Sequence, residues 1–168
     1  MKKFLLFISV FVFFINADGQ SLDNRYFSYV SNKGVVYFFY PQKLSKVEGI
    51  ENFCYDLTYV ANSDLATLNF TIETKNIVEI AELSICYAND TIKIEDYSML
   101  FRDVVKNGYE TRITSTIKKT NLLNIYGSSD TMCFVLTLKD GRICKASYNR
   151  KRWKKDSSVF TKILNSIY

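Results

Sequence analysis

Apolar and polar residues alternate with a period of two along much of the chain, which is typical of β-strands that bury one face. In one long example, residues 53–60, one face carries Phe53, Tyr55, Leu57 and Tyr59. A polar turn at residues 61–64 leads to a second such segment, whose apolar face carries Leu68, Phe70 and Ile72. The two segments are therefore predicted to pair as antiparallel strands.

Other segments repeat this alternation between polar turns, at residues 35–40, 81–87, 92–94, 109–117, 132–138 and 143–148. The last two flank Asp140-Gly141, and Asp-Gly between alternating runs indicates a hairpin with a two-residue turn. That turn would place Cys144 opposite Thr137, on the same face as Cys133. A further short apolar stretch, residues 122–126, lies among these predicted strands.

Two segments show helical spacing. Asp96 is a suitable cap for a short helix that ends at Gly108 and carries Leu100, Phe101, Val104 and Val105 on one side. Behind the cap candidates Asp156, Ser157 and Ser158, apolar residues recur at Val159, Phe160, Ile163, Leu164 and Ile167. The expected fold is mainly β (β-rich α+β), an antiparallel sandwich-like arrangement or a partly open barrel, with a short central helix and a C-terminal amphipathic helix.

The N-terminus has the features of a secretory signal peptide. Two lysines precede an apolar run over residues 4–15, which is shorter than the about 20 residues needed to span a bilayer. Ala17 and Gly19 then form a small-residue cleavage site. We expect residues 1–19 to be removed and residues 20–168 to form one exported β-rich domain, periplasmic or secreted, with no integral membrane association after cleavage. An uncleaved membrane anchor is the alternative.

Composition excludes several classes of active site. The chain contains no histidine, so Ser-His-Asp and Cys-His arrangements and imidazole metal ligands are absent. Its six glycines are isolated from one another, which excludes a glycine-rich phosphate-binding loop. Carboxylate pairs, such as Glu79 with Glu82 or Glu95 with Asp96, are compatible with glycoside hydrolysis but also with solvated strand faces and turns. We therefore expect no enzymatic activity, no cofactor and no metal.

The four cysteines are Cys54, Cys86, Cys133 and Cys144. An even number in an exported chain is compatible with disulfides, and buried free thiols are the alternative. The predicted hairpin separates Cys133 from Cys144 by about 13 Å along the strands, beyond the about 7 Å between Cα atoms that a disulfide spans. Any bridge is therefore expected to join the hairpin to Cys54 or Cys86.

Positive charge is concentrated between residues 142 and 155, a segment with no acidic residue and with the only tryptophan of the chain. The candidate binding residues are Arg142, Lys145, Arg150, Lys151, Arg152, Trp153, Lys154 and Lys155. If the segment after residue 148 is extended, it presents a cationic strip to an anionic partner, and the indole stacks on a sugar or a base. The alternative is an edge strand or loop kept soluble by its charges, with Trp153 folded onto the core.

Together these features predict a non-enzymatic binding or interaction module. Its partner is expected to be an unknown protein, a glycan or another anionic ligand, engaged through the basic strip. A secreted inhibitor or effector that acts on a protein partner is the alternative, and a carboxylate-based hydrolase is a third class. The fold class does not distinguish these functions, because one fold serves many.

Overall fold

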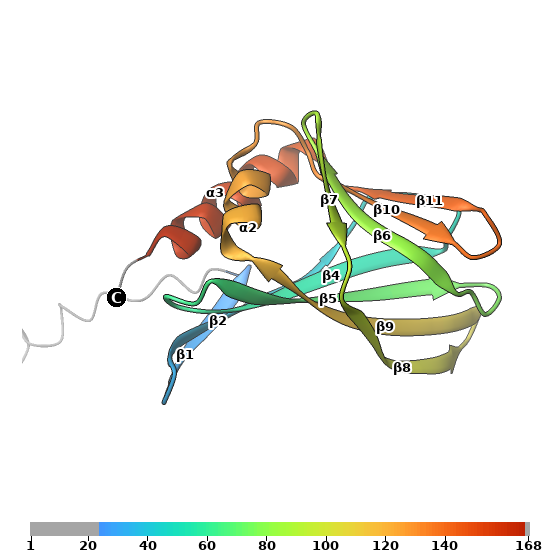
Figure 1. Ribbon diagram of the computed structural model, residues 1–168, viewed down its shortest axis with the longest axis horizontal. Helices are drawn as coiled ribbons and strands as arrows, with labels where there is room; N and C mark the ends of the chain where they lie inside the picture. Colours follow the sequence, from blue (N-terminus) through green and yellow to red (C-terminus); the bar gives the residue numbers. More distant parts are fainter. Residues whose placement is uncertain (1–23, 167–168) are drawn as a thin grey trace, which may run out of the picture.

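Two antiparallel sheets stacked on each other make up most of the molecule (Figure 1). The computed structural model describes residues 24–166, and the predicted signal peptide at residues 1–19 lies outside them. The six-stranded sheet has the order β1 (Tyr26–Ser31), β2 (Gly34–Lys43), β4 (Asn52–Val60), β5 (Leu65–Thr74), β9 (Gly108–Lys118), β8 (Tyr97–Val105). The five-stranded sheet has the order β3 (Lys46–Glu48), β11 (Ile143–Ser147), β10 (Cys133–Leu138), β6 (Ile80–Tyr87), β7 (Asp90–Ile94).

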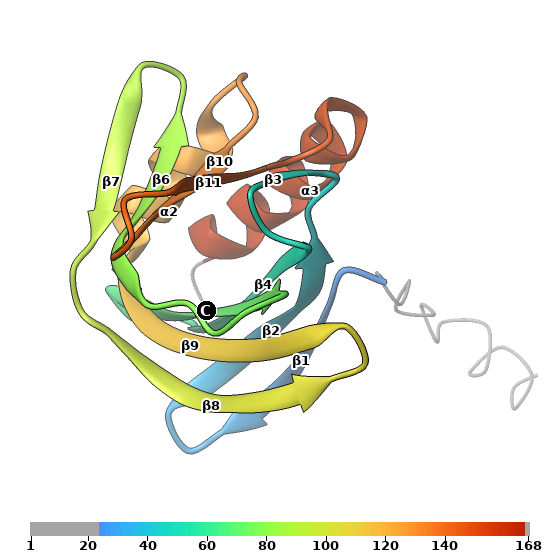
Figure 2. The same cartoon turned by 90° about the vertical axis from the view of Figure 1, so that its right-hand side faces the viewer.

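Two helices lie side by side at one end of the sandwich (Figures 1 and 2). Helix α2 (Lys119–Gly127) follows β9, and helix α3 (Arg150–Asn165) follows β11. No helix within residues 24–166 is long and apolar enough to cross a membrane. The predicted fold class, mainly β with two antiparallel sheets and helices, is confirmed; the sheets do not close into a barrel.

Aromatic rings from both sheets form the centre of the core. Phe134 on β10 lies 4.9 Å from Phe53, 5.2 Å from Tyr55 and 5.4 Å from Phe70, measured between ring centroids. All four side chains are almost completely buried. The predicted pairing of residues 53–60 with the next segment is confirmed, because β4 and β5 pair in register from Asn52 opposite Glu73 to Tyr59 opposite Ala66.

The central helix predicted between Asp96 and Gly108 is wrong, because residues 97–105 form the edge strand β8. A register shift between Met99 and Phe101 interrupts the strand. Such a bulge moves the following side chains to the other face and so breaks the period of two. As a result, Phe101, Val104 and Val105 beyond the bulge have the sequence spacing of a helix although they lie in a strand. The short helix of the fold is α2, which contains the apolar stretch at residues 122–126, predicted to lie among strands.

The β10–β11 hairpin is confirmed, but its register differs from the predicted one by one residue. Ile143, and not Cys144, lies opposite Thr137, so Cys144 pairs with Leu136. Gly141 adopts a φ of 86° within a loop longer than two residues. Since a shift of one residue exchanges the two faces of a strand, Cys144 faces the core while Cys133 faces outward. The prediction that Cys133 and Cys144 share one face of the hairpin is therefore wrong.

Candidate anionic-partner site

Helix α3 carries most of the predicted basic strip, so the strip is helical and not extended. The helix begins earlier than predicted because Asn149 caps it: its side-chain oxygen accepts hydrogen bonds from the backbone N–H groups of Lys151 and Arg152, at 3.0 and 3.3 Å. Asp156 and Ser157, predicted as caps, lie buried within the helix. A first turn rich in basic residues opposes the helix dipole, so contacts with the rest of the protein must hold α3 in place.

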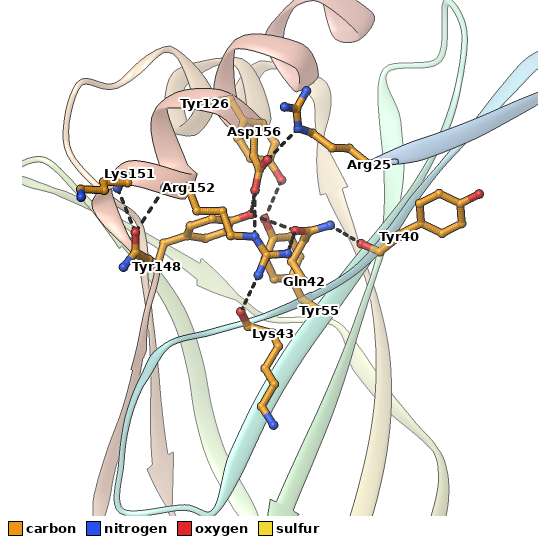
Figure 3. A network of polar contacts seen from close by, with 11 residues as sticks. Arg25, Tyr40, Gln42, Lys43, Tyr55, Tyr126, Tyr148, Lys151, Arg152 and Asp156 are labelled. Carbon is orange, nitrogen blue, oxygen red and sulfur yellow. Dashed lines mark hydrogen bonds and ion pairs between the residues drawn. The ribbon is translucent and has the colours of Figure 1, made fainter. Parts of the chain in front are cut away.

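A buried polar network supplies these contacts (Figure 3). The carboxylate of Asp156, which is 5% exposed, lies 3.0 Å from Arg25 Nε and 3.3 Å from Arg152 Nε. The Tyr148 hydroxyl donates to Asp156 Oδ2 at 2.6 Å and lies 3.1 Å from Gln42 Oε1. Arg152 also donates to Gln42 Oε1 and, at 3.2 Å, to the carbonyl oxygen of Lys43. The network thereby fastens α3 to β2, to the residue that follows β11 and to the segment before β1.

Burial raises the pKa of three tyrosine hydroxyls that lie beneath α3. It raises the pKa of Tyr148, and the neighbouring Asp156 carboxylate raises it further. Desolvation likewise raises the pKa of Tyr55 and of Tyr126, whose hydroxyl oxygens lie 3.4 Å apart. A phenol is protonated at neutral pH even at its ordinary pKa, and the raised pKa keeps these three protonated in more alkaline solution as well. They act as hydrogen-bonding and packing groups.

The proposed role of Trp153 in stacking on an external ligand is wrong. Its side chain is 1% exposed, and its ring packs between Tyr126 and Tyr148 at centroid distances of 5.6 and 5.2 Å. The indole N–H donates to the carbonyl oxygen of Ser128 at 3.3 Å. The alternative prediction, that Trp153 folds onto the core, is correct.

Three more residues of the strip have partners within the protein or lie outside α3. Arg152 is held by Asp156 and Gln42, and Arg142 pairs with Asp140 at 2.7 Å in the hairpin loop. Lys145 lies on β11, with Glu48 of β3 as its register partner. The structure therefore divides the predicted strip, and only part of it remains available to a partner on one surface.

The outer face of α3 brings together the remaining basic residues and one that sequence reasoning missed. We call it the basic face: Arg150, Lys151, Lys154, Lys155 and Lys162. All five side chains are exposed, and none forms an ion pair with another residue between 24 and 166. The only acidic residue of α3, Asp156, is on the buried side. Lys162 could have been found from its helical spacing to Lys151 and Lys155.

A cleft of about 220 Å³ opens between the sheets, away from α3. Its lining combines apolar residues of β5 and β9, such as Ile72 and Ile113, with Arg102, Lys139 and Glu79. The Glu79 carboxylate lies 2.7 Å from Lys139 Nζ, and this contact lowers the pKa of Glu79. A general acid needs a raised pKa, so this carboxylate is unsuited to that role. Glu82, its proposed companion, pairs with Lys93 at 3.0 Å.

A cluster of aromatic side chains covers the outer face of β1 and β2. We call it the aromatic cluster: Phe27, Tyr29, Phe38 and Tyr40. Neighbouring ring centroids lie 5.3 to 6.1 Å apart. Tyr29 is 52% exposed and Phe27 is 43% exposed, and both belong to an edge strand. An exposed group of contiguous apolar residues is typical of an interaction site.

Comparison of the chain with models of protein families, with curated proteins and with solved structures gave no match. The function is therefore inferred from the residues and their geometry.

Proposed function

We propose that this protein is an exported, non-enzymatic binding module, and that the basic face of α3 engages a linear polyanion such as an acidic glycan. The observation that carries the proposal is the exposure of five basic side chains on one helical face with no acidic residue among them. From Arg150 to Lys162 this face is about 18 Å long at 1.5 Å of rise per residue. A linear polyanion repeats its charges along such a length.

The internal contacts of α3 support this proposal. The Asp156 network and the packing of Trp153 position the helix without using the basic face. Mutually repelling basic side chains cost helix stability, and two of those on the basic face, Arg150 and Lys151, are in the first turn. Their presence is therefore better explained by a partner than by the fold. A rigid helix also limits the entropy lost when a partner binds.

Charge reversal on α3 is expected to abolish polyanion binding without unfolding the domain. The variant Lys151→Glu/Lys154→Glu/Lys155→Glu should lose retention on heparin, which serves as the probe polyanion. The variant Lys33→Glu/Lys75→Glu/Lys106→Glu makes the same change in net charge in exposed turns outside α3, and should stay retained. Equal loss in both variants, or no retention of the unmodified protein at low salt, would contradict the proposal.

Salt dependence gives an independent count of the contacts. If all five cations engage duplex DNA, used as a probe of known charge density, log affinity should fall against log salt with a slope of about −4.5. Neutralising two of them in Lys154→Gln/Lys155→Gln should reduce the slope by about 2. Titrations at several salt concentrations measure both values. An unchanged slope would mean that these lysines do not contact the polyanion.

The aromatic cluster favours a second candidate function, an inhibitor or effector that binds a protein partner. Aromatic residues are enriched at protein interfaces, and an edge strand offers unpaired backbone groups. Replacement of Phe27 and Tyr29 by serine should then abolish recovery of a protein partner from extracellular fluid, while heparin retention persists. The charge-reversal variant should show the opposite result, which distinguishes the two functions.

A further inference from the structure

Two cysteines from different parts of the chain lie directly opposite each other on neighbouring strands. In the pairing of β10 with β6, Cys133 is the direct register partner of Cys86. Direct partners in an antiparallel pair have side chains on the same face and Cα atoms about 4.5 to 5.5 Å apart. A disulfide requires Cα atoms about 4.4 to 6.8 Å apart. The backbone therefore places this pair at a distance that a disulfide spans.

The surroundings of the two thiols make them accessible. Their strand neighbours Phe134 and Ile85 face the core, so both cysteines point outward, and both are half-buried. The Ser147 hydroxyl lies 3.3 Å from Cys133 Sγ, and the Thr91 hydroxyl lies 3.5 Å from Cys86 Sγ. The two cysteines also line one surface hollow of about 400 Å³. A small oxidant can reach them there.

The other two cysteines have no such arrangement. Cys144 is completely buried on the inner face of β11, and Cys54 lies in the other sheet, on β4. Burial raises the pKa of both thiols, which lowers the fraction of reactive thiolate at neutral pH. All four cysteines are free thiols in the structure. Cys86 and Cys133 are therefore the two thiols that are both accessible and close enough to form a disulfide, unlike Cys54 and Cys144.

We propose that Cys86 and Cys133 are a redox-active pair that forms a cross-strand disulfide with a small disulfide oxidant, while Cys54 and Cys144 stay reduced. One thiolate attacks the oxidant, whose S–S bond breaks as a mixed disulfide forms and the first thiol leaves. The second thiolate displaces the second thiol, so one S–S bond forms in the protein. The two protein protons pass to the two released thiols, and the oxidant takes up the two electrons.

The bridge would connect β6 to β10, which are central strands of the five-stranded sheet. The intervening chain contains β7, β8, β9 and α2. A disulfide that closes so long a segment restricts the unfolded chain and so stabilises the fold. Oxidation would therefore enclose β7, β8, β9 and α2, which include strands of both sheets, in one covalent loop.

The test is to incubate the purified protein with glutathione disulfide, denature it, alkylate the free thiols and map the peptides without reduction. We expect two alkylated residues, Cys54 and Cys144, and one linked peptide pair that contains Cys86 and Cys133. The variant Cys54→Ala/Cys144→Ala should keep the bridge, and Cys86→Ser should lose it. Four alkylated cysteines, a bridge that includes Cys54 or Cys144, or a persistent glutathione adduct without an internal bridge would overturn the proposal.

Discussion

Replacement of Phe134 by alanine is expected to lower the free energy of unfolding by about 3 to 5 kcal/mol, as for other large aromatic residues in cores. The ring is completely buried, and it contacts Phe53, Tyr55 and Phe70 of the opposite sheet. Its loss removes apolar burial and leaves a cavity between the two sheets, which the surrounding strands can fill only partly. Denaturant unfolding followed by far-UV circular dichroism measures the change.

Two further variants make the test of Phe134 sharper. Thr137→Val changes the outer face of the same strand, and it should alter the free energy of unfolding by less than about 1 kcal/mol. Phe134→Leu keeps most of the apolar volume, so it should remain folded and show a smaller loss than alanine. A loss below about 1 kcal/mol for Phe134→Ala would mean that the sheets do not pack through this ring.

Replacement of Asp156 by asparagine is expected to cost about 2 to 3 kcal/mol of unfolding free energy. Asn keeps the volume but removes the charge that accepts from Tyr148 and pairs with two arginines. Hydrogen bonds to charged groups contribute about 1.5 to 3 kcal/mol. The effect should stay below the about 3 to 5 kcal/mol typical of a broken buried pair, because Arg25 and Arg152 are 31% and 44% exposed and can be solvated.

The loss at Asp156 should be concentrated in α3. Hydrogen exchange should accelerate at the backbone amides of α3 before those of β4 and β5, because Asp156 lies on α3 and none of its partners belongs to β4 or β5. Tyr148→Phe removes only one hydroxyl and should cost about 1 kcal/mol. Asp103→Asn, at an exposed position of β8, should leave both measurements unchanged. If Asp156→Asn also left them unchanged, the network would not be what positions α3.

Alternation of apolar and polar residues was enough to predict the strands that form the core. Phe53, Tyr55, Leu57 and Tyr59 are each at most 1% exposed, as their shared face in the sequence indicated. Strand faces depend on neighbours two residues away, so they can be read locally. The same reading failed at β8, where one bulge changed the period, and in the β10–β11 hairpin, where one extra loop residue exchanged the faces of β11.

The candidate site depended on contacts that no local pattern contains. The sequence by itself determined that basic residues concentrate near the C-terminus and that an amphipathic helix follows. The start of the helix at Arg150 follows from its neighbour Asn149, a local cap that the prediction missed. Only the tertiary structure decided how the helix is held against the sheets, because Gln42, which contacts Arg152, is 110 positions away in the sequence. In the helix as it is packed, Trp153 is buried, Arg152 contacts Asp156 and Gln42, and Lys162 joins the exposed basic face. Likewise, pairing of β6 with β10 brings Cys86 opposite Cys133, since strand order and register are set by packing of the whole chain.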